Sequence, residues 1–172
     1  MDVLAHALWT NLAYYKKYKT NLKNRLWAVF FGIAPDLVSF APSTVYLLFH
    51  RDMFLRYKLS LEFGRMEWFF RWAVESYKYT HSFVIFLVCF AIVAFARKGK
   101  IYWPMFGWAL HIFIDIFTHK DFFQTPFLFP LSQFTNHHAI AWTEPYFMAV
   151  NYAVLIILYT LTFVVQRHAK AK

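Results

Sequence analysis

The sequence predicts an all-α membrane protein, a polytopic bundle of four to five apolar helices with one interfacial amphipathic helix. Hydrophobic residues make up 60% of the 172 residues, aromatic residues 23% and charged residues only 16%. A soluble domain of this length carries more charge on its surface. Several apolar runs also approach the length of about 20 residues that crosses a bilayer. No repeat or linker interrupts the chain, so residues 1–172 are expected to form a single domain.

The first half of the chain contains three predicted segments. Residues 2–15 form a shorter apolar helix that is expected to enter the bilayer only in part. Residues 26–49 are long enough to cross, but one glycine and two prolines predict a kink or break near Asp36. Residues 50–78 mix charges with Phe, Trp and Leu, which is typical of an amphipathic segment at the membrane interface.

The second half contains three apolar runs. Residues 79–96 and 101–118 are joined by the short basic loop 97–100 and are expected to form a helical hairpin. Residues 145–166 carry no charge and are the clearest predicted span.

Basic residues cluster in 16–25, in 97–100 and in the C-terminal tail, which the positive-inside rule assigns to the cytoplasm. A crossing N-terminal helix gives five spans, and a non-crossing one gives four. The net charge of +9 is spread between apolar runs, so no nucleic-acid partner is expected. Cys89 is the single cysteine, which excludes an internal disulfide and a thiolate cluster. The N-terminus lacks the pattern of a cleaved signal peptide.

Three ionisable residues stand at intervals of four in an apolar run. His111, Asp115 and His119 therefore lie on one helix face, where neighbouring side chains can bind one ion and the carboxylate can bridge two. A polar contact between helices is the alternative. Each buried charge in a membrane costs about 2.5–3.5 kcal/mol or more, so three together favour a metal-binding or catalytic role.

Three further polar residues, His6, Asp36 and His81, lie in apolar surroundings. Taken singly, they suit a core histidine, a helix cap after Pro35 and an interface histidine. The predicted topology places these three residues in the non-cytoplasmic half of the membrane, together with the helix face of His111, Asp115 and His119. One mixed His/Asp site is therefore expected there. The following loop adds polar residues that form a predicted lid or contact a substrate phosphate: Lys120, Asp121, Gln124, His137, His138 and Glu144.

Five short motifs occur in a fixed order between about residues 5 and 145: His6, Pro35-Asp36, Thr80-His81-Ser82, His111 with Asp115 and Thr118, and Pro130-Leu131-Ser132. In this order they resemble the bacterial membrane-bound metal-dependent hydrolases, the YdjM-like family. That family is distantly similar to zinc-dependent phospholipase C and related nucleases, which are helical phosphoesterases. The resemblance implies a phospholipase C-like helical core with five ligands, His6, Asp36, His81, His111 and Asp115, the last as a bridge.

The chain departs from the family at two positions. A second acid often follows the PD aspartate where this chain has Val38, and His-Arg often precedes THS where it has Tyr77, Lys78 and Tyr79. We therefore expect one or two divalent ions, with zinc ahead of manganese or iron. His119 is expected to be an accessory ligand.

Together these features predict a hydrolase of the bacterial inner membrane whose site faces the non-cytoplasmic side. Its substrate would be a phosphoester in a lipid or other amphipathic molecule, and its partners would be membrane lipids. Asp36 or Glu144 would act as general base where not a ligand, beside Asp115. The alternative is a non-enzymatic membrane protein that binds or transports metal or acts as a scaffold.

Overall fold

The computed structural model describes residues 1–50, 68–120 and 123–170, and it confirms the all-α class within them, with no strand. In chain order the elements are α1 (Val3–Tyr15), α2 (Leu22–Phe49), α4 (Trp68–Thr80), α5 (Phe83–Ala96), the 3₁₀ turn η1 (Trp103–Met105), α6 (Phe106–Thr118) and α7 (Pro145–Lys170).

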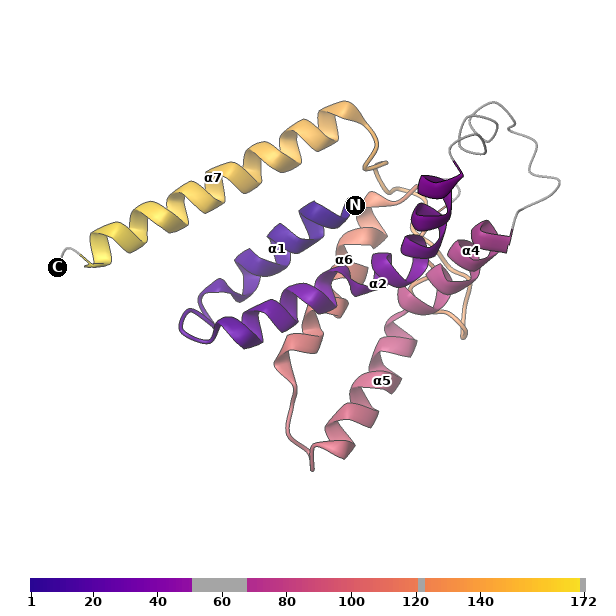
Figure 1. The fold of residues 1–172 in the computed structure, drawn as a ribbon, viewed down its shortest axis with the longest axis horizontal. Coiled ribbons are helices and arrows are strands. Elements are labelled where there is room, and N and C mark those ends of the chain that lie inside the picture. Colours follow the sequence, from indigo (N-terminus) through magenta and orange to yellow (C-terminus); the bar gives the residue numbers. More distant parts are fainter. Residues whose placement is uncertain (51–67, 121–122, 171–172) are drawn as a thin grey trace.

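Helix α2 is the centre of the bundle, and α1, α4 and α6 pack against it (Figure 1). Helix α5 continues the chain from α4 and projects away from the centre, whereas α7 lies beside α1 and extends past its end. The candidate site residues come from α1, α2, α6 and the α4–α5 junction. The central helices therefore position the candidate site, and α7 lies at the periphery.

Polar side chains fix where three of the helices begin. The Asp2 carboxylate accepts a hydrogen bond from the backbone of Ala5, and the Asn21 side chain accepts one from Asn24. Ser82 caps α5 in the same way. These residues satisfy backbone N–H groups that have no partner inside the helix, which is why Asp, Asn and Ser are favoured at this position.

Helix α2 is not broken near Asp36, and of the predicted kink or break only a change of direction is present. Helix α2 runs from Leu22 to Phe49 with both prolines inside it, although it changes direction along its length (Figure 1). Pro42 has no N–H to bond the Val38 carbonyl. The indole nitrogen of Trp72 in α4 donates to that carbonyl instead, at 3.0 Å. A neighbouring helix thus supplies the hydrogen bond that the proline removes, and the helix continues.

The described residues contain fewer spanning helices than the four to five predicted. Helix α2 and residues Pro145–Val164 of α7 are long and apolar enough to cross a membrane. Helices α4 and α5 pass the same test together, with a bend of 65° between them. The predicted span at 101–118 contains an α-helix of only 13 residues, or about 20 Å at 1.5 Å per residue, short of the hydrocarbon thickness. Helix α1 has the same length, which agrees with the expectation of a shorter N-terminal helix that enters the bilayer only in part.

The predicted interfacial segment 50–78 falls mostly on residues 51–67, which lie outside the described residues. Its described end is α4, which pairs with α5 as a bent span. The predicted helix at 79–96 is therefore a helix from Phe83 preceded by a bend at His81, and not one uninterrupted rod.

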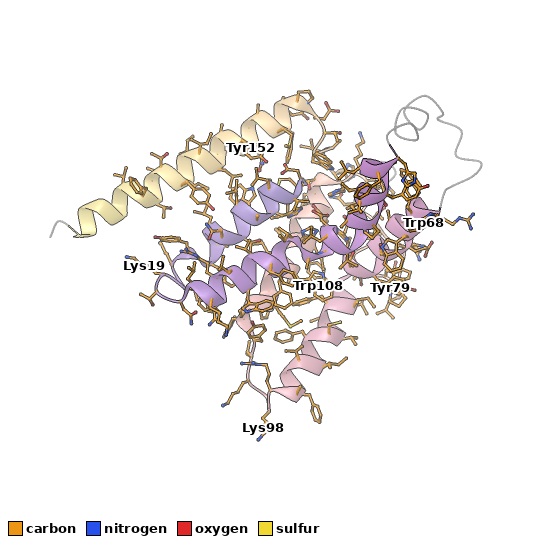
Figure 2. The ribbon with its side chains drawn as sticks, in the orientation of Figure 1. Lys19, Trp68, Tyr79, Lys98, Trp108 and Tyr152 are labelled. Carbon is orange, nitrogen blue, oxygen red and sulfur yellow. The ribbon has the colours of Figure 1, made fainter. Side chains whose placement is uncertain are left out.

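Large apolar side chains cover much of the outer surface, including Phe49, Phe95 and Leu131, each at least 80% exposed. Lys19 and Lys98, by contrast, lie in two interhelical loops and point away from the bundle (Figure 2). A largely apolar surface with basic residues in interhelical loops is the pattern of a protein in contact with a membrane. The structure is consistent with the predicted membrane association.

Candidate metal centre

Two glycines let three helices approach closely around the site. A β-carbon on Gly107 of α6 would collide with the Ala28 carbonyl of α2, and one on Gly32 of α2 would collide with Thr10 of α1. The small residues therefore bring the backbones of α2 and α6 into contact. This contact sets the distance at which His111, one turn after Gly107, reaches α2.

Four buried side chains converge at this crossing: Asp36 from α2, His81 from the α4–α5 junction, and His111 and Asp115 from α6. One ligand atom from each lies within 4.8 Å of the others. The Nε2 atoms of His81 and His111 are 2.9 Å apart. They lie 3.3 Å and 3.1 Å from Oδ2 of Asp115, and 3.6 Å and 3.7 Å from Oδ1 of Asp36.

Backbone carbonyls determine which nitrogen of each ring carries the proton. The Nδ1 of His111 lies 2.8 Å from the Gly32 carbonyl, and the Nδ1 of His81 lies 3.2 Å from the Tyr77 carbonyl. The Thr80 hydroxyl, which donates to the Ser76 carbonyl, lies 2.8 Å from the same Nδ1 and accepts from it. A carbonyl only accepts hydrogen bonds, so each Nδ1 carries the N–H. Both Nε2 lone pairs then face each other and the two carboxylates. This orientation of metal-binding histidines by a carbonyl is common in metal sites.

The four converging atoms fit a small divalent cation. Two Nε2 lone pairs at 2.9 Å beside carboxylates are stabilised by a positive charge between them, either a proton or a metal ion. Zinc–nitrogen and zinc–oxygen bonds of about 2.0–2.1 Å in a tetrahedron place ligand atoms about 3.3 Å apart. The separations here bracket that value. Among the described residues, Oδ2 of Asp36 and Oδ2 of Asp115 have no hydrogen-bond partner although both are buried.

The other oxygen of Asp115 belongs to a second group of contacts. Its Oδ1 lies 2.9 Å from Nε2 of His6, 3.1 Å from Nδ1 of His119 and 2.6 Å from the Met1 amine, which donates to it. Asp115 therefore joins the four-residue cluster through Oδ2 and these groups through Oδ1. A carboxylate with both oxygens engaged on different sides has the geometry of a bridge between two sites.

The two outer histidines lie in helix α1 and after α6, outside the candidate spans. Burial in apolar surroundings lowers the pKa of His6 to about 4. Burial also lowers the pKa of His119 from its usual value. A neutral imidazole keeps a free lone pair, which is the form that binds a metal.

A cavity of about 480 Å³ opens beside the cluster. Asp36 and His119 form part of its wall, together with the aromatic rings of Phe40 and Trp142 and the exposed Lys120. The cavity thus places one candidate ligand, one accessory histidine and one cation around the same space. A ligand with an anionic group and an apolar part matches this lining.

The structure gathers the six predicted ligands at one place: His6, Asp36, His81, His111, Asp115 and His119 are all buried there. Glu144 is exposed at the beginning of α7, and His137 and His138 are exposed in the preceding loop beside a different cavity. Gln124 accepts a hydrogen bond from Thr135. Asp121 lies outside the described residues.

The two departures from the family pattern do not open the cluster. Val38 is 48% exposed, since two residues turn a helix by about 200° and point it away from Asp36. Tyr77 stacks on the His81 ring with centroids 3.7 Å apart, and its carbonyl holds His81 Nδ1. Tyr77 therefore orients a candidate ligand, which sequence analysis did not predict.

Other contributions were also missed. The Gly32 carbonyl that orients His111 leaves no side-chain signal in a sequence. Ser82, in the THS motif, donates to the Phe129 carbonyl beside the PLS motif, and the Phe83 N–H donates to the Phe127 carbonyl at 2.8 Å. These contacts, such as that of Ser82 with Phe129 47 residues later, show that the two short motifs lie together beside His81.

Comparisons with protein-family models, curated proteins and solved structures find no match to this chain. The family resemblance therefore stays a prediction from the motifs, and the proposals below rest on the geometry of the site.

Proposed function

We propose that the protein is a membrane-embedded, metal-dependent hydrolase that cleaves a phosphoester in a lipid or other amphipathic substrate. The observation that carries this proposal is the convergence of Asp36, His81, His111 and Asp115 on one buried point. The hydrogen bonds of the two histidines direct both Nε2 atoms toward the two carboxylates. This donor set suits zinc, with manganese or iron as alternatives.

A divalent ion at this cluster would supply Lewis-acid catalysis, since it lowers the pKa of water toward 7 and polarises a phosphoryl oxygen. The chain's own residues perform the remaining tasks. Asp36 lies between the cluster and the cavity, and its Oδ2 has no partner among the described residues. Where it is not a ligand, this oxygen can accept the proton of an attacking water molecule.

The cavity supports the choice of an amphipathic, anionic substrate. Lys120 lies at its wall and can bind a phosphate group by charge. Phe40, Phe123 and Trp142 supply apolar surface next to it. The helices that surround the site are covered with exposed apolar side chains, so a lipid would reach the cavity from the side at high local concentration.

A non-enzymatic metal-binding protein is the second candidate, and the site itself offers one observation for it. Four protein ligands are typical of structural zinc sites, whereas catalytic sites keep one position open. The position of Asp36 in the cavity wall is the feature that favours a catalytic site, because substrate and water in the cavity would lie next to the cluster. A transporter would instead need ligands along a path through both leaflets, and the candidate ligands gather at one point.

The test is phospholipid hydrolysis by purified protein in vesicles of phosphatidylglycerol and phosphatidylethanolamine with added zinc. ³¹P NMR would follow the release of a phosphate-bearing product. We expect release with wild type and none above background with His111→Gln. His50→Gln is the matched control, because His50 is exposed and its ring bonds the Tyr46 carbonyl of its own helix.

The two candidates predict different results. Metal-loaded wild type that releases no product from either lipid would contradict the hydrolase and support the metal-binding protein. Equal release by wild type and His111→Gln would show that the cluster takes no part in the hydrolysis.

A further inference from the structure

A second cavity, of about 570 Å³, lies between α1, α6 and α7. Its walls are almost entirely apolar and include Leu12 of α1, Phe113 of α6 and Val150 of α7. The volume falls within the range of small-molecule binding sites. Because all three walls carry apolar side chains in a protein with membrane-spanning helices, the chemistry of this cavity suits a hydrocarbon chain.

One buried polar group breaks the apolar lining. Asn151 of α7 is 8% exposed and lines the cavity. The Trp9 indole nitrogen, which only donates, lies 2.9 Å from one side-chain atom of Asn151 and thereby identifies it as Oδ1. The other atom, Nδ2, has no hydrogen-bond partner among the described residues. A buried amide N–H without an acceptor costs free energy, so this position favours a ligand that brings an oxygen.

The second cavity also adjoins the candidate metal centre. Thr118 lines it and lies 3.3 Å from Oδ1 of Asp115 through its hydroxyl. Met1 lines both cavities, and its amine donates to the same carboxylate oxygen. A molecule held along the second cavity would therefore have its polar end near Asp115 and the lysine-bearing first cavity.

We propose that the second cavity binds an acyl chain of a membrane lipid, with Asn151 Nδ2 donating a hydrogen bond to the ester carbonyl of that chain. The assignment of this lipid as the substrate rests on the proposed function. The ester carbonyl supplies the acceptor that Asn151 lacks, and the hydrocarbon matches the apolar walls. The substrate class is then an acyl-ester phospholipid, whose phosphate lies toward Lys120 while its chain lies between α1, α6 and α7.

The test is photo-crosslinking of the full chain in detergent micelles that contain a phosphatidylglycerol with a diazirine on one acyl chain. Peptide mass spectrometry would measure label on the α6 peptide that carries Phe113. We expect this label to be competed by excess acyl-ester phosphatidylglycerol. The ether-linked analogue lacks the carbonyl and should compete about 2- to 10-fold less well, as expected for the loss of one hydrogen bond.

Three variants separate the cavity from nonspecific lipid contact. Val150→Trp fills the cavity and should lower the label at Phe113 by at least about 5-fold, as expected for overpacking. Leu161→Trp is the matched control on the same helix, 55% exposed and away from the cavity lining, and should leave the label unchanged. Asn151→Asp keeps the acceptor for Trp9 but removes the donor, so it should abolish the preference for the ester.

Label at Phe113 that excess lipid does not compete, or that Val150→Trp and Leu161→Trp reduce equally, would overturn the proposal. Equal competition by ester and ether lipids in wild type would overturn the role of Asn151. Lipid hydrolysis without competed label would leave the proposed function intact and reject this cavity. Competed, ester-selective label without hydrolysis would support the acyl-chain site and reject the hydrolase.

Discussion

Helices α2 and α7 are both long and apolar enough to cross a membrane, yet they are built for different surroundings. In α2, 33% of the most apolar stretch is buried inside the protein, against 11% in α7. The buried positions of α2 include Gly32, Asp36 and Ser39, which are small or polar. In α7 the exposed positions are apolar, such as Val150, Ile156 and Leu161.

The difference shows that the apolar character of a helix does not determine how much of its surface is buried inside the protein. Helix α2 is surrounded by other helices, whose side chains form hydrogen bonds with its polar and backbone groups. The bond from Trp72 to the Val38 carbonyl is an example. Helix α7 contacts α1 along one face, through hydrogen bonds such as that of Trp9 with Asn151, and its other faces present apolar side chains to the surroundings of the protein. We therefore expect changes at the centre of the bundle to alter metal binding and stability, and changes on the outer face of α7 to alter neither.

The largest expected effect is the stabilisation of the folded state by metal. Free zinc at about 1,000 times its dissociation constant stabilises a single-site protein by about 4 kcal/mol. We expect this increase in the free energy of unfolding for wild type and for the α7 variant Leu161→Ala, measured by denaturant titration in one detergent. His81→Gln removes a central ligand and should lose the increase. An equal increase in His81→Gln would place the ion elsewhere.

A β-carbon at the α2–α6 contact should have the next largest effect. Gly107→Ala directs a methyl group into the Ala28 carbonyl, and overpacking of this kind costs about 1–3 kcal/mol of unfolding free energy. Ala153→Val, on the exposed face of α7, adds more volume and should cost only about 0.5 kcal/mol. Equal losses of stability in the two variants would show that the α2–α6 contact is no more tightly packed than the exposed face of α7.

Much of the fold could be predicted from local sequence, because it depends on composition and spacing. The apolar runs gave the positions of α2, α5 and α7, and Asp2 caps α1 as short polar residues commonly do. The predicted span at 101–118 is too long, because Trp103–Met105, which includes Pro104, forms a 3₁₀ turn and the α-helix begins only at Phe106. The continuity of α2 depends on Trp72, 30 residues after Pro42, which local rules for proline do not include.

The candidate site was predictable where it lies within one helix. The spacing of four between His111 and Asp115 places both on one face of α6 whatever surrounds that helix. The positions of Asp36 and His81 depend on how other helices cross α6. The groups that orient the ligands, such as the Gly32 carbonyl, are backbone atoms that every residue possesses. The rest of the site therefore depends on how the helices pack, which the spacing of residues within one helix does not predict.

The hydrogen bond that replaces the one lost at Pro42 should have a smaller effect. Trp72→Phe removes the donor to the Val38 carbonyl and should lower the free energy of unfolding by about 1 kcal/mol. In the background of Pro42→Ala that carbonyl regains a partner within its own helix, so the same substitution should cost less. A double-mutant cycle measures the difference. Identical costs in both backgrounds would show that the indole N–H contributes nothing at this carbonyl.

The smallest effect is expected on the outer face of α7. Leu161 is 55% exposed, and exposed substitutions usually change stability by no more than about 0.5 kcal/mol. Denaturant titration of Leu161→Ala measures this change. A loss above about 1 kcal/mol would mean that this face packs against protein and that α7 resembles α2 more than the fold implies.

The metal content of the purified protein tests the central claim most directly. Inductively coupled plasma mass spectrometry would be applied to wild type, to Asp115→Asn and to Glu75→Gln, whose exposed carboxylate pairs with Lys78 outside the cluster. We predict about one or two divalent ions per chain in wild type and in Glu75→Gln, and almost none in Asp115→Asn. Wild type without a bound ion, or a folded Asp115→Asn that retains its ions, would contradict the assignment of this cluster as a metal centre.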